Sequence, residues 1–230
     1  AYQPILPAPR AEQGSPLSFA QQRLWFLDQL DHAAGAAYHI PTAMRLSGEL
    51  DRAALRSALD CIVARHEGLR TRFVAHEGVP LQVIDERVES FALVEQDLRH
   101  LDEVARKRAI EAISVVEAQS EFDLATGPLI RGRLLLLAEC EHVLLVTQHH
   151  IVSDGWSIGV LVQEVSALYA AFSQGLPDPL PPLPLQYADY AIWQRQRITL
   201  HDEVEFWRGH LANAPARLEL PTDRPRPAMQ

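Results

Sequence analysis

The sequence has little cysteine, with only Cys61 and Cys140 among 230 residues. Both stand in apolar segments, so we expect two buried, reduced thiols of a cytoplasmic protein, with a disulfide as the alternative. Long apolar runs are also lacking, because stretches such as residues 134–137 and 143–146 fall far below the about 20 residues that cross a bilayer. No basic and apolar leader opens the chain, so neither secretion nor a membrane partner is expected.

A basic surplus is absent as well. The chain has 21 Lys and Arg against 30 Asp and Glu, which gives a net charge of −9. No basic stripe is present, so nucleic acid is not expected as a partner, and the acidic surplus is interpreted as a solvated face. Apolar residues make up 47% and charged residues 22%, which indicates an ordered domain with a real core.

The first 16 residues differ in composition from the rest of the chain. Residues 1–16 carry three prolines before Gly14 and have no apolar period, which predicts a tether. Order is expected from Leu17 onward. Ser18 can cap a helix whose leucines follow helical spacing as far as Leu30.

Apolar periodicity predicts alternating strands and helices along the remaining chain. Further helices are expected after a cap at Asp51 and over residues 101–119, 157–172, 187–197 and 203–211, with Ile110, Ile113 and Val116 as a buried stripe. Strands are expected over residues 40–46, 128–137 and 142–149, with a hairpin joining 69–74 to 81–84 through Glu77 and Gly78. Residues 175–184 and 218–227 should be extended. The strands at 128–137 and 142–149 are nearly continuously apolar, which predicts an α/β sandwich with both sheet faces covered.

The sharpest feature is QHHIVSDGWS at residues 148–157, between an apolar strand and a helix. Such junctions are where α/β folds usually expose chemistry. Adjacent strand residues point to opposite faces, so His149 and His150 line one pocket only if the strand breaks between them. A metal site needs three or four converging ligands, and no third His or Cys stands nearby, so no metal is expected.

Acid–base catalysis requires fewer residues in this segment than a metal site does. One neutral imidazole can accept a proton from an attacking amine or orient that amine. Gly155 lets a backbone N–H approach a substrate, and the helix opening near Ser157 could favour developing negative charge. Asp154 could stabilise the imidazole or hold the loop through an arginine. The alternative is that both histidines are satisfied core residues and that Asp154 and Gly155 form only a turn.

The HHxxxDG pattern at residues 149–155 resembles the signature of nonribosomal peptide synthetase condensation domains, which belong to the chloramphenicol acetyltransferase-like superfamily. Three further segments resemble the first, second and fourth motifs of that family, in the same order: residues 18–25 (SFAQQRLW), 65–73 (RHEGLRTRF) and 187–194 (YADYAIWQ). The resemblance covers residues 17–227.

The resemblance implies a fold and a domain organisation. The family has two lobes with a tunnel between them, and each lobe is a two-layer α/β sandwich of the chloramphenicol acetyltransferase-like fold. Residues 17–230 would be the N-terminal lobe, with the C-terminal lobe absent from this chain. Residues 1–16 are then interpreted as a linker from an upstream carrier domain.

The resemblance also implies amide bond formation between two carrier-bound thioesters. His150 would act as the base or as the group that orients the amine, and Gly155 would allow close backbone approach. Asp154 is interpreted as structural, paired with Arg65 or, as second choice, Arg70. Loss of one partner of such a buried pair would cost about 3–5 kcal/mol.

The other candidates receive supporting roles. His149 is interpreted as a packing or hydrogen-bonding residue. Tyr169, on the following helix, is a weaker candidate to face the tunnel. Trp25, Trp193 and Trp207 are assigned to packing rather than to the site.

No cofactor is expected on this chain, because phosphopantetheine would be presented by the carrier proteins. The implied partners are donor and acceptor carrier domains, the missing C-terminal lobe and an adjacent adenylation domain. The lobe alone is expected to be inactive. The alternative function is a non-catalytic carrier-docking module that keeps the motif only for folding, while a coenzyme A-dependent acyltransferase is disfavoured by the tether.

Overall fold

The computed structural model describes residues 4–11, 13–30, 32–86, 90–196, 200–215, 221 and 223–224. The chain divides into two compact units, residues 1–195 and residues 196–230. The first unit contains both sheets and the HHxxxDG motif.

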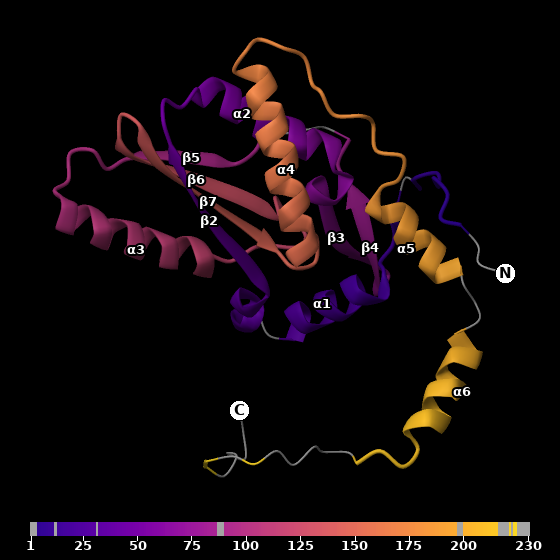
Figure 1. Cartoon of the computed structure of the whole chain (residues 1–230). Helices are drawn as coiled ribbons and strands as arrows, with labels where there is room; N and C mark the ends of the chain where they lie inside the picture. The colour runs from indigo at the N-terminus through magenta and orange to yellow at the C-terminus, as the bar shows by residue number, and fades with distance from the viewer. Residues whose placement is uncertain are drawn as a thin grey trace. The chain divides into compact units, whose positions relative to one another are not determined.

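Two sheets frame the first unit (Figure 1). The strands are β1 (Ser15–Pro16), β2 (His39–Ser47), β3 (Thr71–His76), β4 (Val79–Ile84), β5 (Leu93–Asp97), β6 (Ile130–Ala138) and β7 (Glu141–His149). The larger sheet has the order β2-β7-β6-β5, with β5 parallel to β6, and the smaller sheet has the antiparallel order β1-β4-β3. β1 and β5 are additional to the predicted strands, because β1 has two residues and β5 (LVEQD) lacks an apolar run.

The helices begin close to the predicted caps. They are α1 (Phe19–Leu30), α2 (Arg52–Arg65), α3 (Glu103–Gln119), α4 (Gly155–Phe172), α5 (Tyr187–Gln196) and α6 (Leu200–Leu211), with 3-10 turns η1 (His32–Tyr38) and η2 (Glu67–Arg70). Ser18 and Gln21 form a capping box, because each backbone N–H donates to the other side chain, at 2.9 and 3.1 Å. Asp51 accepts from the N–H of Ala54 at 2.9 Å. Both predicted caps are confirmed.

The predicted hairpin is also confirmed, as β3 and β4. Its turn residues Glu77 and Gly78 have φ angles of 52° and 81°. Two successive positive φ values define the type I′ turn that matches strand twist, and glycine adopts such a value without strain. β3 begins at Thr71, so Leu69 and Arg70 belong to η2 rather than to the predicted strand.

Helices cover both faces of the larger sheet (Figure 1). On one face, α2 and α4 pack against apolar residues of β6 and β7 that include Leu134 and Leu144. On the other face, α3 packs against residues that include Leu135 and Leu145. The mixed α/β class is as predicted, and α3 adds a layer to the two-layer sandwich.

Order begins before Leu17, contrary to the predicted boundary. Ser15 and Pro16 pair with Gln82 and Leu81 of β4, so β1 forms an edge strand of the smaller sheet. Further upstream, Arg10 forms ion pairs within the first unit. Part of the predicted tether is therefore built into the domain.

Two burial predictions are wrong. Val116 is exposed on α3, whereas the neighbouring Glu117 is buried and forms ion pairs with Arg131 and Arg133 on β6, at 2.7 and 3.3 Å. Cys140 is exposed at the β6–β7 turn, and both cysteines are free. Apolar sequence neighbours alone do not decide burial at a helix edge or in a turn.

α6 forms part of the second unit. The rings of Phe206, Trp207 and His210 pack against one another along it. It begins at Leu200, earlier than predicted, while most of the predicted extended segment at 218–227 lies outside the described residues.

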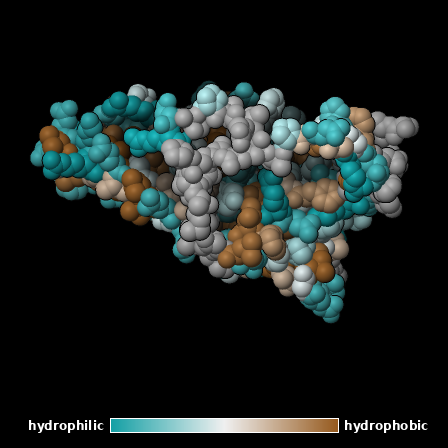
Figure 2. All heavy atoms as spheres, turned by 90° about the horizontal axis from the view of Figure 1, so that it is seen from below, coloured by the Kyte–Doolittle hydropathy of each residue, from teal (hydrophilic) through white to brown (hydrophobic). Residues whose placement is uncertain are grey.

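Hydrophilic residues cover much of the face shown in Figure 2, with hydrophobic patches between them. Of the helices that the structure describes, none has the length and apolarity to cross a membrane.

Candidate active site

The HHxxxDG motif lies where β7 ends and α4 begins. β7 ends at His149, and α4 starts at Gly155, so residues 150–154 form the connecting turn. The N–H of Val152 donates to the carbonyl of His149 at 3.1 Å, which closes this turn. The strand therefore ends at His149, and His150 is the first residue of the turn.

His150 is exposed at the start of the turn. Its Nδ1 lies 2.7 Å from the carbonyl oxygen of Ser153. A carbonyl oxygen only accepts, so Nδ1 carries the proton and Nε2 of the neutral ring holds a lone pair. The backbone N–H of His150 donates to the carbonyl of Tyr38 at 2.8 Å, which fixes the residue to the end of η1.

His149 points into the interior and is 1% exposed. Its Nδ1 accepts from the N–H of Ile151 at 3.1 Å, and its ring lies against those of His39 and Phe122. Burial, with the nearby His39 and His150, lowers the pKa of His149 to about 4. The ring is therefore neutral near pH 7.

The predicted ion pair of Asp154 with an arginine is wrong. Asp154 is exposed and forms the N-cap of α4, where Oδ1 accepts from the N–H of Ser157 at 2.8 Å and from its hydroxyl at 2.7 Å. These two bonds lower the pKa of the carboxyl. The N–H of Ser157 is thus used by the cap and does not point at a substrate.

The two candidate arginines have other partners. Arg65 Nε donates to Glu164 of α4 at 3.2 Å, and the same carboxylate binds His66 Nε2 at 2.6 Å. Arg70 donates to the backbone carbonyl of Asp85 at 2.5 Å. The second motif therefore joins α2 to α4 and to β4 rather than to Asp154.

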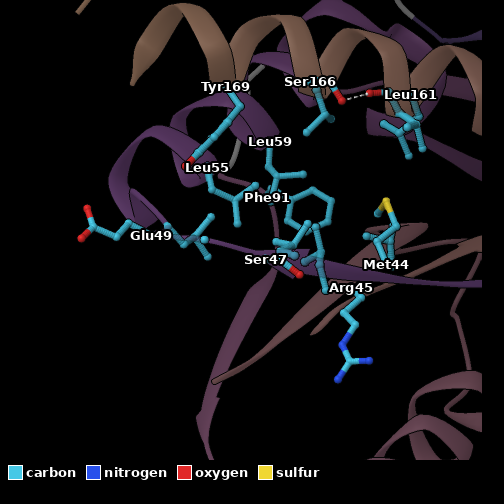
Figure 3. Close-up of a pocket in the computed structure, with 17 residues that line it drawn as sticks. Met44, Arg45, Ser47, Glu49, Leu55, Leu59, Phe91, Leu161, Ser166 and Tyr169 are labelled. Atoms are coloured by element: carbon cyan, nitrogen blue, oxygen red, sulfur yellow. Dashed lines mark hydrogen bonds between the residues drawn. The ribbon is translucent and has the colours of Figure 1, made fainter. Parts of the chain in front are cut away.

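Gly155 and Tyr169 lie at opposite ends of α4. A Cβ at Gly155 would meet no atom within 4 Å, so the space beside this residue is open. Tyr169 instead accepts from the N–H of Asp51 at 3.1 Å and lines an apolar pocket of about 330 Å³ under α2 and α4 (Figure 3). Leu144 of that pocket lies about 17 Å along β7 from His149. Tyr169 therefore does not belong to the motif site.

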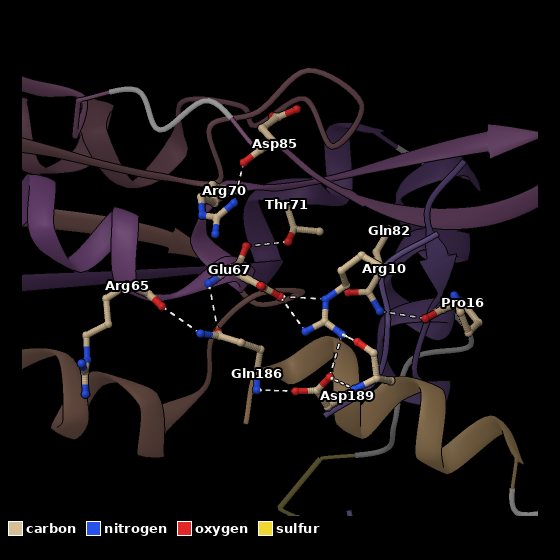
Figure 4. A network of polar contacts seen from close by, with 11 residues as sticks. Arg10, Pro16, Arg65, Glu67, Arg70, Thr71, Gln82, Asp85, Gln186 and Asp189 are labelled. Carbon is tan, nitrogen blue, oxygen red and sulfur yellow. Dashed lines mark hydrogen bonds and ion pairs between the residues drawn. The ribbon is translucent and has the colours of Figure 1, made fainter. Parts of the chain in front are cut away.

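A polar network links the second and fourth motifs to the N-terminal segment (Figure 4). Arg10 donates to Glu67 at 2.8 and 3.0 Å and to Asp189 at 2.6 Å. Gln186 accepts from the N–H of Glu67 at 3.1 Å and donates to the carbonyl of Arg65 at 2.9 Å. Neither Arg10 nor Gln186 was predictable as a partner, because both lie outside the motif segments and far from their partners in sequence.

Metal ligands do not converge here. Among the residues that the structure describes, no group of three or more His, Cys, Asp or Glu could hold an ion. The chemistry that this junction offers is that of a single imidazole, fixed in one tautomer beside an open helix start.

Comparison with solved structures first defines the class of fold. The chain superposes on the X-domain in a complex with OxyB from teicoplanin biosynthesis, with a TM-score of 0.83 and 33% identity over 99% of this chain and 50% of that one. It also superposes on the starter condensation domain of rhizomide synthetase RzmA, with a TM-score of 0.78 and 22% identity over 88% of this chain and 48% of that one, which bears on the fold alone. These are chloramphenicol acetyltransferase-like folds, so the predicted fold class is confirmed.

Sequence comparison gives the family. The condensation domain family matches residues 11–230, and this chain belongs to it. Malpibaldin synthetase from Mortierella alpina is 46% identical over 227 residues, which is 96% of this chain and 4% of that protein. The chain thus spans a small part of this synthetase and about half of the solved chains.

Proposed function

We propose that this chain is the N-terminal lobe of a condensation domain and that, joined to a C-terminal lobe, it forms amide bonds between carrier-bound aminoacyl or peptidyl thioesters. The match to about half of each solved chain supports the lobe assignment. The geometry of His150 supports the catalytic part, because this residue is exposed and the Ser153 carbonyl holds the tautomer that leaves Nε2 as the acceptor.

In the proposed reaction, the acceptor amine attacks the donor thioester carbonyl. A C–N bond forms, the C–S bond breaks, and the amine loses one proton. His150 Nε2 accepts this proton or holds the amine in line, and the proton ends on the departing phosphopantetheine thiol. Phosphopantetheine belongs to the donor and acceptor carrier domains, so this chain supplies the imidazole and the open space at Gly155.

Asp154 has an indirect role in this proposal. By capping α4 through Ser157, it fixes the turn that carries the Ser153 carbonyl and hence the orientation of His150. His149 packs this turn against the interior as a neutral residue. Arg65 supports the same junction by holding α2 to α4, whereas Arg70 holds η2 to Asp85, the residue after β4.

The test is amide formation between two loaded carrier proteins. We would compare this chain alone, the chain joined to a C-terminal lobe, and the joined form with His150→Ala or His76→Ala. His76 is an exposed histidine of β3 and serves as the matched control. Loss of one acid–base group should lower the rate about 10²–10⁴-fold for His150→Ala, with no change for His76→Ala.

A second candidate function is a docking module without catalysis. The X-domain that this chain resembles is described in a complex with OxyB, which favours protein binding as a role for such a fold. Carrier binding with no amide formation by any form would support this function. Turnover that depends on His150 would exclude it.

A further inference from the structure

The turn that begins at His150 is anchored at two points outside itself. On one side, the backbone N–H of His150 donates to the carbonyl of Tyr38 at 2.8 Å. On the other side, His149 accepts twice, because its carbonyl binds the N–H of Val152 and its Nδ1 binds the N–H of Ile151, both at 3.1 Å. The orientation of His150 therefore depends on how firmly Tyr38 and His149 are held.

His39, Phe122 and His149 form a cluster of three rings beside these anchors. His39 directly follows Tyr38, so both anchors of the turn adjoin the cluster. Phe122 meets both histidines edge to face, with ring centroids 4.9 Å from His39 and 6.1 Å from His149, which is a favourable arrangement. Among the described residues, Nε2 of His149 makes no hydrogen bond, so the orientation of this ring depends on its Ile151 bond and on the neighbouring rings.

Phe122 is itself held by Arg131 of β6. The guanidinium carbon of Arg131 lies 3.8 Å from the centre of the Phe122 ring, which is a cation–π contact. The same guanidinium forms an ion pair with Glu117 at 2.7 Å, and the Arg131 side chain is only 19% exposed. A cation–π contact is stronger where water is excluded, so Arg131 should hold the ring firmly.

Arg131 also binds the C-terminal end of α3. It donates to three backbone carbonyls there, at 2.5–3.1 Å, which are those of Glu117, Ser120 and Glu121. The last carbonyls of a helix lack partners within it, so a planar guanidinium with five N–H donors suits this position. Nδ1 of His39 lies 2.8 Å from the carbonyl oxygen of Ala118, so the ring cluster contacts the same end of α3.

Arg133 shows which part of this arrangement is special to Arg131. It lies on the same strand and binds the same carboxylate, with Nε 3.3 Å from Glu117. Among the interactions of the described residues, Arg133 has this ion pair and no bond to the α3 carbonyls. The two arginines thus share a partner, while the contact with Phe122 belongs to Arg131.

We propose that Phe122 and Arg131 are positioning residues for His150. Arg131 fixes the Phe122 ring, and the ring holds the two histidines that adjoin the anchors of the turn. Neither residue touches the substrate. The catalytic consequence rests on the proposed function, because a shifted turn would move His150 Nε2 away from the attacking amine.

The first test measures amide formation by the complete condensation domain with loaded carrier proteins. Phe122→Leu should lower kcat at least about tenfold with little change in KM, because a small misplacement of a reacting group is costly. Phe172→Leu is the matched control, since Phe172 is also partly buried but packs at the C-terminal end of α4. Arg131→Lys keeps a charge opposite Glu117 but loses the planar guanidinium, so it should also lower kcat, whereas Arg133→Lys should not.

Double variants show whether the effect passes through His150. If it does, Phe122→Leu should cause no further loss of the residual rate that His150→Ala retains. General damage to the fold would lower the rate by the same factor with and without His150, and this result would overturn the proposal.

Nitrogen-15 NMR of the histidine rings gives a measurement that does not depend on activity. In the wild-type domain, the signal that disappears in His150→Ala should show the proton on Nδ1, as the bond to the Ser153 carbonyl requires. Phe122→Leu should shift this signal toward a mixture of the two tautomers, and Phe172→Leu should leave it unchanged.

The positioning role and the proposed function can fail separately. If the wild type forms amides and Phe122→Leu keeps both the rate and the Nδ1 proton of His150, the positioning role is wrong and the proposed function stands. If the wild type forms no amide with matched carriers but Phe122→Leu changes the His150 tautomer, the positioning role stands and the proposed function fails.

Discussion

Asp154 accepts two hydrogen bonds from Ser157, one from the backbone N–H at 2.8 Å and one from the hydroxyl at 2.7 Å. The aspartate of the HHxxxDG motif is thus an exposed helix cap within the first unit. Its contribution to stability should be that of a cap and not that of a buried ion pair.

Asp154→Ala should lower the free energy of unfolding by about 1 kcal/mol, the usual effect of removing an N-cap. Asp154→Asn should stay close to wild type, because its side-chain oxygen still accepts from Ser157. Asp102→Ala is the matched control, since Asp102 caps α3 through Ala105 at 2.8 Å. Urea unfolding measures all three, and a loss above about 3 kcal/mol for Asp154→Ala alone would instead indicate a buried pair.

The cap also has a predicted pH dependence. The Ser157 hydrogen bonds lower the pKa of Asp154 from its ordinary value of 3.8. A carboxyl with a depressed folded-state pKa stabilises the protein fully above the unfolded value and loses this effect as the pH falls through the folded value. The stability difference between wild type and Asp154→Asn should therefore change only below about pH 5, and a change near neutral pH would contradict this assignment.

Gly155 and Gly159 provide a matched pair on α4. A Cβ at either position would meet no atom within 4 Å, so alanine should fit both without loss of stability. Only Gly155 adjoins the turn that carries His150, where a methyl group would enter the space proposed for the substrate. We expect Gly155→Ala to lower the rate of amide formation about tenfold or more and Gly159→Ala to leave it unchanged, with no loss of thermal stability in either variant. Equal rates for the two variants would mean that no substrate approaches Gly155.

Local signals in the sequence predict much of the fold. The cap at Asp51, the turn at Glu77 and Gly78 and the apolar run of β7 each depend on residues within a few positions of one another. The strand–helix junction at His149 and His150 follows from the same kind of pattern. These features need no knowledge of distant contacts.

The hydrogen-bonding and ion-pair partners of the polar residues could not be predicted from such local signals. Asp154 and Arg65 stand in two family motifs, which suggests a pair, yet Arg65 binds Glu164 and Asp154 binds Ser157. Arg10 looks like part of a tether because of the prolines around it. Its ion pairs with residues 57 and 179 positions away are set by the tertiary fold, which local composition does not encode.

His149 should make the protein less stable in mild acid. Its folded-state pKa of about 4 lies below the ordinary value of 6.5, so the unfolded chain binds a proton that the folded chain rejects. Stability should fall as the pH decreases from about 6.5 to about 4, by up to about 3 kcal/mol. His149→Gln, which keeps an acceptor for the Ile151 N–H, should flatten this part of the profile, whereas exposed His76→Gln should not. Parallel profiles of wild type and His149→Gln in urea unfolding would show that His149 does not carry the effect.

Arg10 should anchor the N-terminal segment through Asp189. Asp189 is 3% exposed and accepts from Arg10, from the N–H of Ala8 at 2.9 Å and from the N–H of Gln186 at 2.8 Å. Removing Arg10 leaves this buried carboxylate without its cation, and a hydrogen bond to a charged group is worth about 1.5–3 kcal/mol. Arg10→Ala should therefore lower the free energy of unfolding by about that amount.

A double-mutant cycle separates this pair from the bond between Arg10 and Glu67. Arg10→Ala, Asp189→Asn and the double variant should give a coupling energy above about 1 kcal/mol in urea unfolding. The cycle of Arg10→Ala with Glu67→Gln should give a smaller value, because Glu67 is more exposed than Asp189 and its charge is better solvated. A coupling energy near zero for Arg10 and Asp189 would mean that the segment before β1 acts as a free tether, and family members should then tolerate its replacement by an unrelated linker without loss of stability.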